Sequence, residues 1–158
     1  MAIITNLTPT IIKPSDVFGY EVNTDVGYGR ETFTIDVGAT PVRVGSVFVV
    51  DYATMTATPA DGTTVTATSQ LGVFVGRDLP TNPATAQDFD RLTMTADGKG
   101  VLIVKGDGRG ILKRGYLDFS GKQYYSLTEQ QRKTIDTAFT TLNRFKMVDQ
   151  QYTPTTGL

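Results

Sequence analysis

The segment Gly106-Asp107-Gly108-Arg109-Gly110 has the glycine content of a phosphate-binding loop but not its spacing. A dinucleotide-binding loop requires G-x-G-x-x-G at the start of a helix, and a P-loop requires Lys and then Ser or Thr after its last glycine. Here the third glycine is misplaced, and Gly115, at P-loop distance from Gly110, is followed by Tyr116 and Leu117. The next residues alternate like a strand, so no helix N-terminus is expected to hold an anion. Because Gly and Asp tolerate positive φ, we predict a tight reversal that joins two strands as a hairpin.

Histidine and cysteine are absent from the chain. Without them there is no Ser-His-Asp triad, no thiolate zinc site and no thiol nucleophile, and the commonest general base is missing. Asp88 and Asp90 offer two carboxylates, but no third acidic ligand lies nearby in the sequence, which favours a solvated loop over a cation site. No set of residues forms a convincing catalytic, cofactor-binding or metal site, so we expect neither an enzyme nor a cofactor.

Two further groups of residues have both a binding and a structural interpretation. Tyr124 and Tyr125 could stack on a sugar or a base, but they directly precede a predicted helix, so at least one is expected in the core. Four basic side chains surround the glycine-rich turn: Lys105, Arg109, Lys113 and Arg114. They either meet an acidic partner surface or keep a hairpin edge solvated.

Composition points to one mainly β domain with frequent turns, because threonine accounts for 26 of 158 residues and glycine for 16. Charge is divided along the chain: residues 1–90 carry 4 Lys or Arg and 10 Asp or Glu, whereas residues 91–146 carry 11 and 5. Such blocks either make complementary surfaces or intermix on folding. The net charge of −1 predicts no nucleic-acid partner, and the lack of a long apolar run predicts no membrane partner.

Residues 1–40 are predicted to form an extended N-terminal arm. Pro9 and Pro14 favour extended geometry in the residues before them, and pairs of apolar residues occur without helical spacing. Residues 31–37 alternate, with Phe33 and Ile35 on one face, which predicts a strand. The arm either binds a partner surface or packs on its own domain as an edge strand, and both interpretations stay open.

Residues 41–148 are predicted to form a β meander, a small barrel-like sandwich, with one helix near the C-terminus. Reversals are expected at Asp61-Gly62 and at 97–100, and the second should pair residues 92–94 with 101–105. Residues 79–90 are predicted to form a loop, because Pro80 and Pro83 would interrupt the hydrogen bonds of a strand. Strands are expected at 42–44, 47–50, 55–58, 64–68, 71–75, 92–94, 101–105 and 111–119.

The one predicted helix covers about residues 128–143. Thr128 is its N-cap, with Gln131 as the reciprocal partner of a capping box. Arg132, Lys133 and Asp136 should face outward. Apolar residues at helical spacing should face the core: Ile135, Ala138, Phe139 and Leu142. Residues 145–148 are expected to add a last short strand, and 149–158 a flexible tail. The fold class is therefore a small α+β domain, mainly β, with one C-terminal helix and an extended arm.

From Pro41 to Val148 the order of these elements resembles the lambda-type head decoration proteins, the small trimeric cement proteins of tailed-phage capsids. A proline-containing extended arm precedes the domain, as in that family. The arm here is longer, the 79–90 loop looks inserted and the C-terminal tail is extra. Four segments carry the resemblance: Asp61-Gly62-Thr63-Thr64, Leu71-Gly72-Val73-Phe74-Val75, the strands on either side of Lys105-Gly106, and the helix containing Thr137-Ala138-Phe139.

The resemblance implies a homotrimer that binds the major capsid protein at local three-fold positions of an expanded head and stabilises that lattice. It places the protein on the outer capsid surface of the virion, after synthesis in the host cytoplasm. The family has no catalytic residues to carry over. The apolar residues of the arm are then the candidates for capsid contact: Ile3, Ile4, Leu7, Ile11 and Ile12, with Phe18 and Tyr20 nearer the body.

Two other classes of function stay open. One is a different virion part, such as a head-fibre base, a head-tail joining subunit or a tail subunit. The other is a small carbohydrate-binding β module, which would require an exposed aromatic platform.

Overall fold

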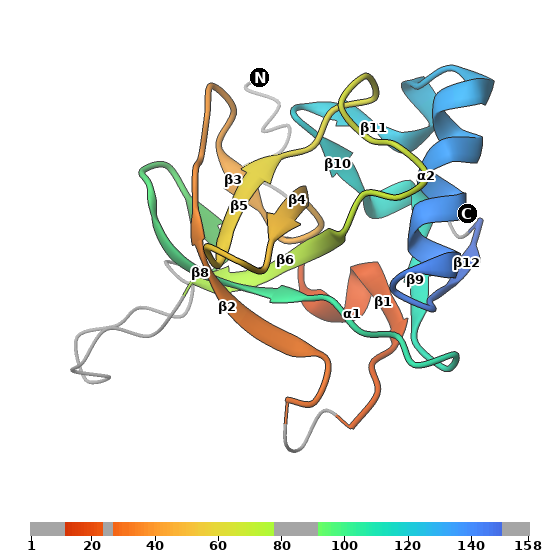
Figure 1. Ribbon diagram of the computed structural model, residues 1–158, viewed down its shortest axis with the longest axis horizontal. Coiled ribbons are helices and arrows are strands. Elements are labelled where there is room, and N and C mark those ends of the chain that lie inside the picture. The colour runs from red at the N-terminus through yellow and green to blue at the C-terminus, as the bar shows by residue number, and fades with distance from the viewer. Residues whose placement is uncertain (1–11, 24–26, 78–91, 150–158) are drawn as a thin grey trace, which may run out of the picture.

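A small barrel of five strands is the main feature of the fold (Figure 1). The structure is a computed structural model, and it describes residues 12–23, 27–77 and 92–149. The barrel closes in the order β2-β5-β4-β6-β8, and its longest pairing joins β2 antiparallel to β8. The strand bounds are β2 Arg30–Ile35, β4 Val47–Asp51, β5 Thr56–Pro59, β6 Leu71–Arg77 and β8 Gly98–Ile103.

The inside of the barrel is filled by large side chains, which we call the inner core: Phe33, Ile35, Val37, Val42, Phe48, Val50, Ala57, Phe74, Met94, Leu102 and Val104. Side chains along the strands alternate between two cores. Phe74 and Leu102 belong to the inner core, whereas their neighbours Val73 and Ile103 belong to a second core outside the barrel. Since β6 is covered on both faces over most of its length, its sequence is a nearly continuous apolar run from Leu71 to Val75.

The second core, called the outer core, lies between the barrel and a layer that contains α2 (Glu129–Thr141) (Figure 1). In this layer β1, β9 and β12 form a sheet with β9 in the middle, and β10 and β11 form a hairpin. The bounds are α1 Pro14–Val17, β1 Phe18–Tyr20, β9 Ile111–Lys113, β10 Asp118–Phe119, β11 Lys122–Gln123 and β12 Lys146–Val148, with short 3-10 turns at Arg114–Tyr116 and Tyr124–Ser126. Buried residues of the outer core include Val17, Leu71, Leu112, Leu117, Phe119, Tyr124, Ile135, Phe139 and Phe145.

The predicted helix is confirmed, and so is its cap. The Thr128 hydroxyl accepts from the Gln131 backbone N–H, while the Gln131 side chain accepts from the Thr128 N–H. Ile135, Ala138 and Phe139 are buried as predicted, but Leu142 at the C-terminal end is 37 % exposed. The helix ends at Thr141, so Leu142 lies where the chain turns away, and β12 follows as expected.

Several predicted strand pairings are wrong. The strands on either side of Gly106–Gly110 do not pair with each other, because β8 belongs to the barrel and β9 to the outer sheet. β7 (Thr93–Met94) pairs with β3 (Val42–Arg43) and not with residues 101–105. Residues 64–68 form turns, and the 111–119 strand is interrupted by a 3-10 turn. A hairpin reversal was predicted at Asp61-Gly62, but the hairpin is formed by β4 and β5 and reverses at residues 52–55, where Met55 has a φ of 53°.

The described part of the predicted arm packs on its own domain. The strand expected at 31–37 is β2, which pairs on both sides within the barrel. Val17, Phe18 and Val22 are buried, and Glu21 accepts two hydrogen bonds from the Arg30 side chain, at 2.6 and 2.8 Å. Within the described residues, the boundary expected near residue 40 therefore does not separate an arm from a body. Residues 1–11, 79–90 of the predicted loop and 150–158 of the tail lie outside the described residues.

Candidate functional site

The candidates for capsid contact do not gather in one place. Ile3, Ile4, Leu7 and Ile11 lie outside the described residues. Ile12 is partly buried against the outer core, and Phe18 is only 6 % exposed, with its ring centroid 6.3 Å from that of Phe145. Tyr20 is 50 % exposed at the end of β1. Phe18 is therefore part of the core of its own chain. Among the capsid-contact candidates that the structure describes, Tyr20 is the one with a largely exposed side chain.

The glycine-rich turn uses its backbone N–H groups internally. Gly106 and Gly108 donate to the carbonyl oxygens of Asn143 and Arg144, at 2.7 and 2.8 Å. Arg109 and Gly110 both donate to the carbonyl oxygen of Gly106. Positive φ values at Asp107 (51°) and Gly108 (75°) confirm the predicted reversal. Because these amides already have partners, the turn is not built to cradle a phosphate; it fastens the chain after α2 to the end of β8.

Two of the basic side chains around this turn pair with acidic side chains of the same chain, and a third contacts a backbone carbonyl. Arg114 contacts Asp136 and Asp149, at 3.1 and 3.0 Å, and is largely buried. Lys105 lies 3.8 Å from Glu31, and Lys113 donates to the carbonyl oxygen of Ser15. The pairs Lys105–Glu31 and Arg43–Asp118 join the acidic and basic halves of the sequence within one molecule. These contacts favour intermixing of the two halves over a single basic patch.

Asp136 was predicted to face solvent, but it lies at the centre of a polar network. It accepts from the Arg114 guanidinium and from the Tyr124 hydroxyl, the latter at 2.8 Å. Tyr124 is 3 % exposed, as expected for one of the two tyrosines. Burial, and then the Asp136 carboxylate, raise the pKa of Tyr124. Hydrogen bonding to Tyr125 and the charge of Arg114 lower the pKa of Asp149. Through Asp136 the network joins α2 to the two 3-10 turns.

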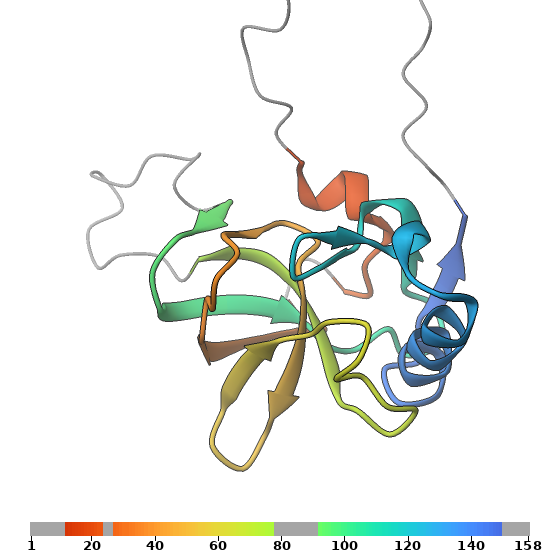
Figure 2. The same cartoon turned by 90° about the horizontal axis from the view of Figure 1, so that it is seen from above.

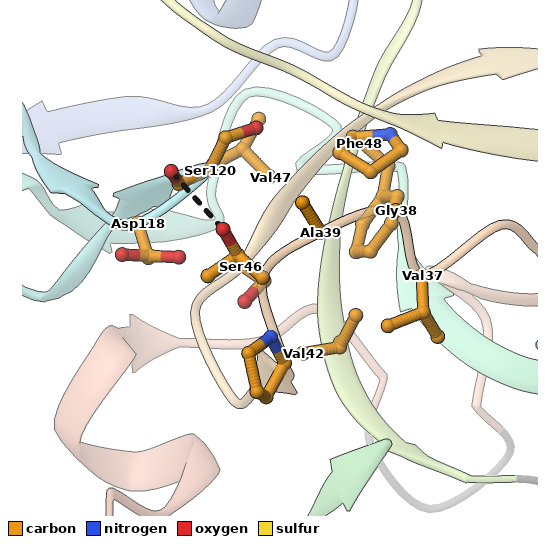
Figure 3. Close-up of a pocket in the computed structure, with 12 residues that line it drawn as sticks. Val37, Gly38, Ala39, Val42, Ser46, Val47, Phe48, Asp118 and Ser120 are labelled. Atoms are coloured by element: carbon orange, nitrogen blue, oxygen red, sulfur yellow. Dashed lines mark hydrogen bonds between the residues drawn. The ribbon is translucent and has the colours of Figure 1, made fainter. Parts of the chain in front are cut away.

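A pocket of about 290 Å³ opens beside β4, between the segment that links β2 to β3 and the start of the β10–β11 hairpin. Figure 3 shows Asp118, Ser46 and Ser120 on one side of the pocket, and Val37 and Phe48 on the other. Gly38, Ala39, Thr40, Pro41 and Val42 complete the wall on the β2–β3 side. The pocket therefore has one polar, acidic wall and one apolar wall.

Asp118 is the charged group of this pocket, and it is 8 % exposed. Its Oδ2 accepts from the Gly121 backbone N–H at 3.2 Å, and its Oδ1 lies 3.8 Å from the Arg43 guanidinium. Arg43 is held behind the wall by hydrogen bonds to the carbonyl oxygens of Val44 and Tyr116. Burial lowers the pKa of Arg43, while the Asp118 carboxylate acts in the opposite direction. The guanidinium offsets part of the cost of burying the carboxylate.

This pocket was not predicted from the sequence. Its residues come from four separate segments, at 37–42, 46–48, 59 and 118–120. None of these segments carries a recognisable motif, and Asp118 was placed within a long strand. A local signal does exist in Ser120 and Gly121, whose φ values of 53° and 90° make the two-residue turn between β10 and β11. That turn places Asp118 and Ser120 at the pocket, but only the fold brings β4 to them.

Within the described ranges, no three His, Cys, Asp or Glu side chains are arranged to hold a metal ion. Neither helix in those ranges is long and apolar enough to cross a membrane. No family model matches the chain, and no curated protein or solved structure is significantly similar to it.

Proposed function

We propose that this protein is a decoration protein of a tailed-phage capsid, which binds the expanded lattice of the major capsid protein as a homotrimer and stabilises it. The observation that carries the proposal is the way in which the leading apolar residues are joined to the body. Ile3, Ile4, Leu7 and Ile11 precede a short segment that is locked into the core at Val17 and Phe18. A partner that holds residues 1–11 is thereby connected to the hydrophobic core of this chain.

The contacts of α1 and β1 make this connection firm. Val17 is fully buried, and β1 pairs antiparallel with β9. Two hydrogen bonds from Arg30 to Glu21, whose side chain is 7 % exposed, then tie the end of this segment to the first barrel strand. Paired and hydrogen-bonded charges of this kind are costly to separate. Pulling on the N-terminal residues would therefore load the barrel itself.

β1 is also accessible to a partner. It is an outer strand of its sheet, in the order β1-β9-β12, and Tyr20 on it is half exposed. Figure 2 shows α1 and the end of β12 on the same side of the molecule, so both ends of the described chain lead to one face. An outer strand can accept a further strand, with backbone hydrogen bonds giving affinity and side-chain pockets giving specificity. This face is the proposed capsid side.

Three copies acting together give such a contact its strength. Ordering an extended segment costs about 1–2 kcal/mol per fixed residue, so one segment alone binds weakly. In a trimer, engagement of one segment raises the effective concentration of the other two, and avidity rises by roughly 10²–10⁴. A protein that binds the expanded lattice but not its precursor stabilises the expanded form by mass action.

The test uses the full chain, a variant lacking residues 2–11 and a control variant lacking residues 150–158. Expanded heads of the virus that carries this gene, free of the protein, are titrated with each variant, and binding is followed by sedimentation. We expect trimeric mass in light scattering, saturable binding of the full chain and of the control, and loss of binding without residues 2–11. Circular dichroism should show the same fold in all three variants.

Two results would contradict the proposal. A monomer that does not bind expanded heads would exclude the decoration role. Equal binding by the variant lacking residues 2–11 would place the contact elsewhere. If the full chain instead co-purifies with fibre bases, head-tail connectors or tails, the protein is a different part of the virion.

A further inference from the structure

The polar wall of the pocket beside β4 offers hydrogen-bond acceptors and few donors. The Ser120 hydroxyl donates to the carbonyl oxygen of Ala60 at 3.0 Å, and the Thr40 hydroxyl donates to the carbonyl oxygen of Ser120 at 3.4 Å (dashed line in Figure 3). Both hydroxyl hydrogens are therefore used, and the oxygen lone pairs remain. Ser46 Oγ already accepts from the Arg43 N–H, at 3.0 Å, and retains a second lone pair.

Asp118 adds the strongest acceptor of this wall. Only Oδ2 receives a hydrogen bond, from Gly121. Among the described residues, no donor lies within hydrogen-bond distance of Oδ1, since the Arg43 guanidinium is 3.8 Å away. Asp118 as a whole is 8 % exposed, and its Oδ1, which has only the longer ion-pair contact with Arg43, belongs to the pocket lining, where an incoming donor can reach it.

The opposite wall and the size of the pocket restrict what can supply that donor. Val37, Val42 and Phe48 present hydrocarbon, and Phe48 is 1 % exposed. The volume of about 290 Å³ lies at the lower end of the range for small-molecule pockets. An occupant of this size is a single side chain or a small fragment, with an apolar body and a donating head.

We propose that this pocket binds an aliphatic primary ammonium, the head group of a lysine side chain, with the N–H donors on Asp118 Oδ1 and the neighbouring hydroxyl oxygens and the methylenes against Val37, Val42 and Phe48. An ammonium has three donors and no acceptor, which matches the acceptor-rich wall. A lysine stem is hydrocarbon and packs along apolar surface.

Lysine fits this site better than arginine does. A guanidinium prefers to bind both oxygens of a carboxylate in a planar fork. Here Oδ2 already accepts from Gly121, so a bidentate guanidinium would have to share that oxygen with the β10–β11 turn. The resident Arg43 also lies on the Oδ1 side, and a compact ammonium can avoid it more easily than a second guanidinium can. This site does not depend on the capsid role, and it is tested without capsids.

The first experiment compares ligands on the unmodified chain. Amide chemical shifts are followed by NMR at neutral pH and constant ionic strength during titration with n-butylammonium, n-butanol and n-butyltrimethylammonium. We expect saturable shifts for n-butylammonium at Gly38, Ala39, Thr40 and Gly121. The other two ligands lack either the charge or the N–H donors, so they should bind about tenfold more weakly or less. Equal affinities, shifts that do not saturate, or shifts away from these residues would overturn the proposal.

The second experiment removes the charge. Asp118→Asn retains the shape and an oxygen that can accept from Gly121, and we expect it to weaken n-butylammonium binding about tenfold. Asp107→Asn is the matched control, because its carboxylate lies in the glycine-rich turn, pairs with Arg144 and does not line the pocket. It should bind as the unmodified chain does. Equal loss in both variants would show a general charge effect and no site at Asp118; if Asp118→Asn does not fold, the ligand series decides alone.

A third ligand distinguishes the sources of the ammonium. Nα-acetyl-lysine N-methylamide carries the same head group on a blocked backbone. If it binds as n-butylammonium does, the pocket accepts a lysine presented by a partner protein. If it is excluded while n-butylammonium binds, the pocket accepts a small free amine.

Discussion

The inner core and the outer core are held together in different ways. The inner core is enclosed by five strands that pair in a closed circle, so its side chains fill a space that the backbone has already defined. The outer core is covered on one side by the barrel and on the other by short strands and α2. Its layer is fastened by a few polar and backbone contacts, above all at residues 143–145 and in the Gly106–Gly110 turn.

This difference predicts where each region tolerates change. In the inner core, a new group would meet side chains, which can leave their preferred rotamers at a moderate cost. In the outer layer, the fastening contacts involve backbone atoms that cannot rotate away. Substitutions at Asn143, Gly106 and Gly100 compare the two regions, and Asn143 is the contact that joins them.

Asn143→Asp should have the largest effect. The Asn143 side-chain amide donates to the carbonyl oxygens of Leu71 and Val104, at 2.7 and 2.6 Å, and so ties the segment after α2 to the start of β6 and to the residue that follows β8. Its own Oδ1 is buried without a partner among the described residues. The substitution removes both donors and places a charge against two carbonyl oxygens, which should lower the free energy of unfolding by about 3–5 kcal/mol.

Asn23→Asp serves as the matched control for this variant. Asn23 is exposed, with a φ of 50° that Asp also tolerates, so its substitution should change stability by less than about 0.5 kcal/mol. Urea unfolding of both variants gives the comparison. A loss below about 1 kcal/mol for Asn143→Asp would mean that other contacts join the two regions.

Gly106→Ala tests the outer layer at its fastening. A Cβ at this position would lie 2.6 Å from the Arg144 carbonyl oxygen and 2.6 Å from the Phe145 ring. Because the oxygen belongs to the backbone, the segment after α2 must move, and the cost should be about 3 kcal/mol. Gly98→Ala is the control, since its Cβ would make only an ordinary contact, 3.6 Å from Met94. If the two variants unfold at the same urea concentration, the turn is not a firm attachment.

The glycine-rich turn also shows what local sequence can and cannot predict. Its reversal followed from the residues that tolerate positive φ, and the structure confirms it at Asp107 and Gly108. Its partner could not be predicted, because turn chemistry fixes dihedral angles and not the sheet in which the next strand pairs. The same holds for β7: it was correctly predicted to be a strand, but it pairs with β3 and not with the predicted partner at residues 101–105.

Elements with a local cause were predicted best. The cap of α2 at Thr128 and the buried face at Ile135 and Phe139 depend on residues within one helix. Asp136 was misplaced because helical spacing alone put it on the solvent side, whereas Arg114 and Tyr124 come from outside the helix to cover it. The pocket could not be predicted for the same reason, since four distant segments build it.

Gly100→Ala tests the inner core and should cost less than Gly106→Ala. A Cβ here would meet the end of the Ile35 side chain and, at 3.0 Å, the Phe74 ring. Both are side chains of the enclosed barrel, which can adjust their rotamers, so we expect a loss of about 2 kcal/mol relative to Gly98→Ala on the same strand. Urea unfolding measures both. A loss larger than that of Gly106→Ala would reverse the comparison and make the barrel the less tolerant region.

Tyr124→Phe should have the smallest effect at neutral pH and a distinctive dependence on pH. The variant loses the hydrogen bond to Asp136, which should cost about 1.5 kcal/mol because the acceptor is charged. Burial and Asp136 hold the pKa of Tyr124 above its ordinary value of 10 in the folded chain. Above about pH 10 the unfolded chain therefore releases a proton that the folded chain retains, and the stability of the unmodified chain falls as pH rises.

Since phenylalanine does not titrate, the variant lacks this part of the fall. The stability difference between the two proteins, measured by urea unfolding at neutral pH and at about pH 11, should shrink at the higher pH. A gap that stays constant would mean that the Tyr124 hydroxyl titrates alike in both states. In that case the network around Asp136 would not hold the phenol, and the outer layer would depend on its apolar core and on the contacts at residues 143–145.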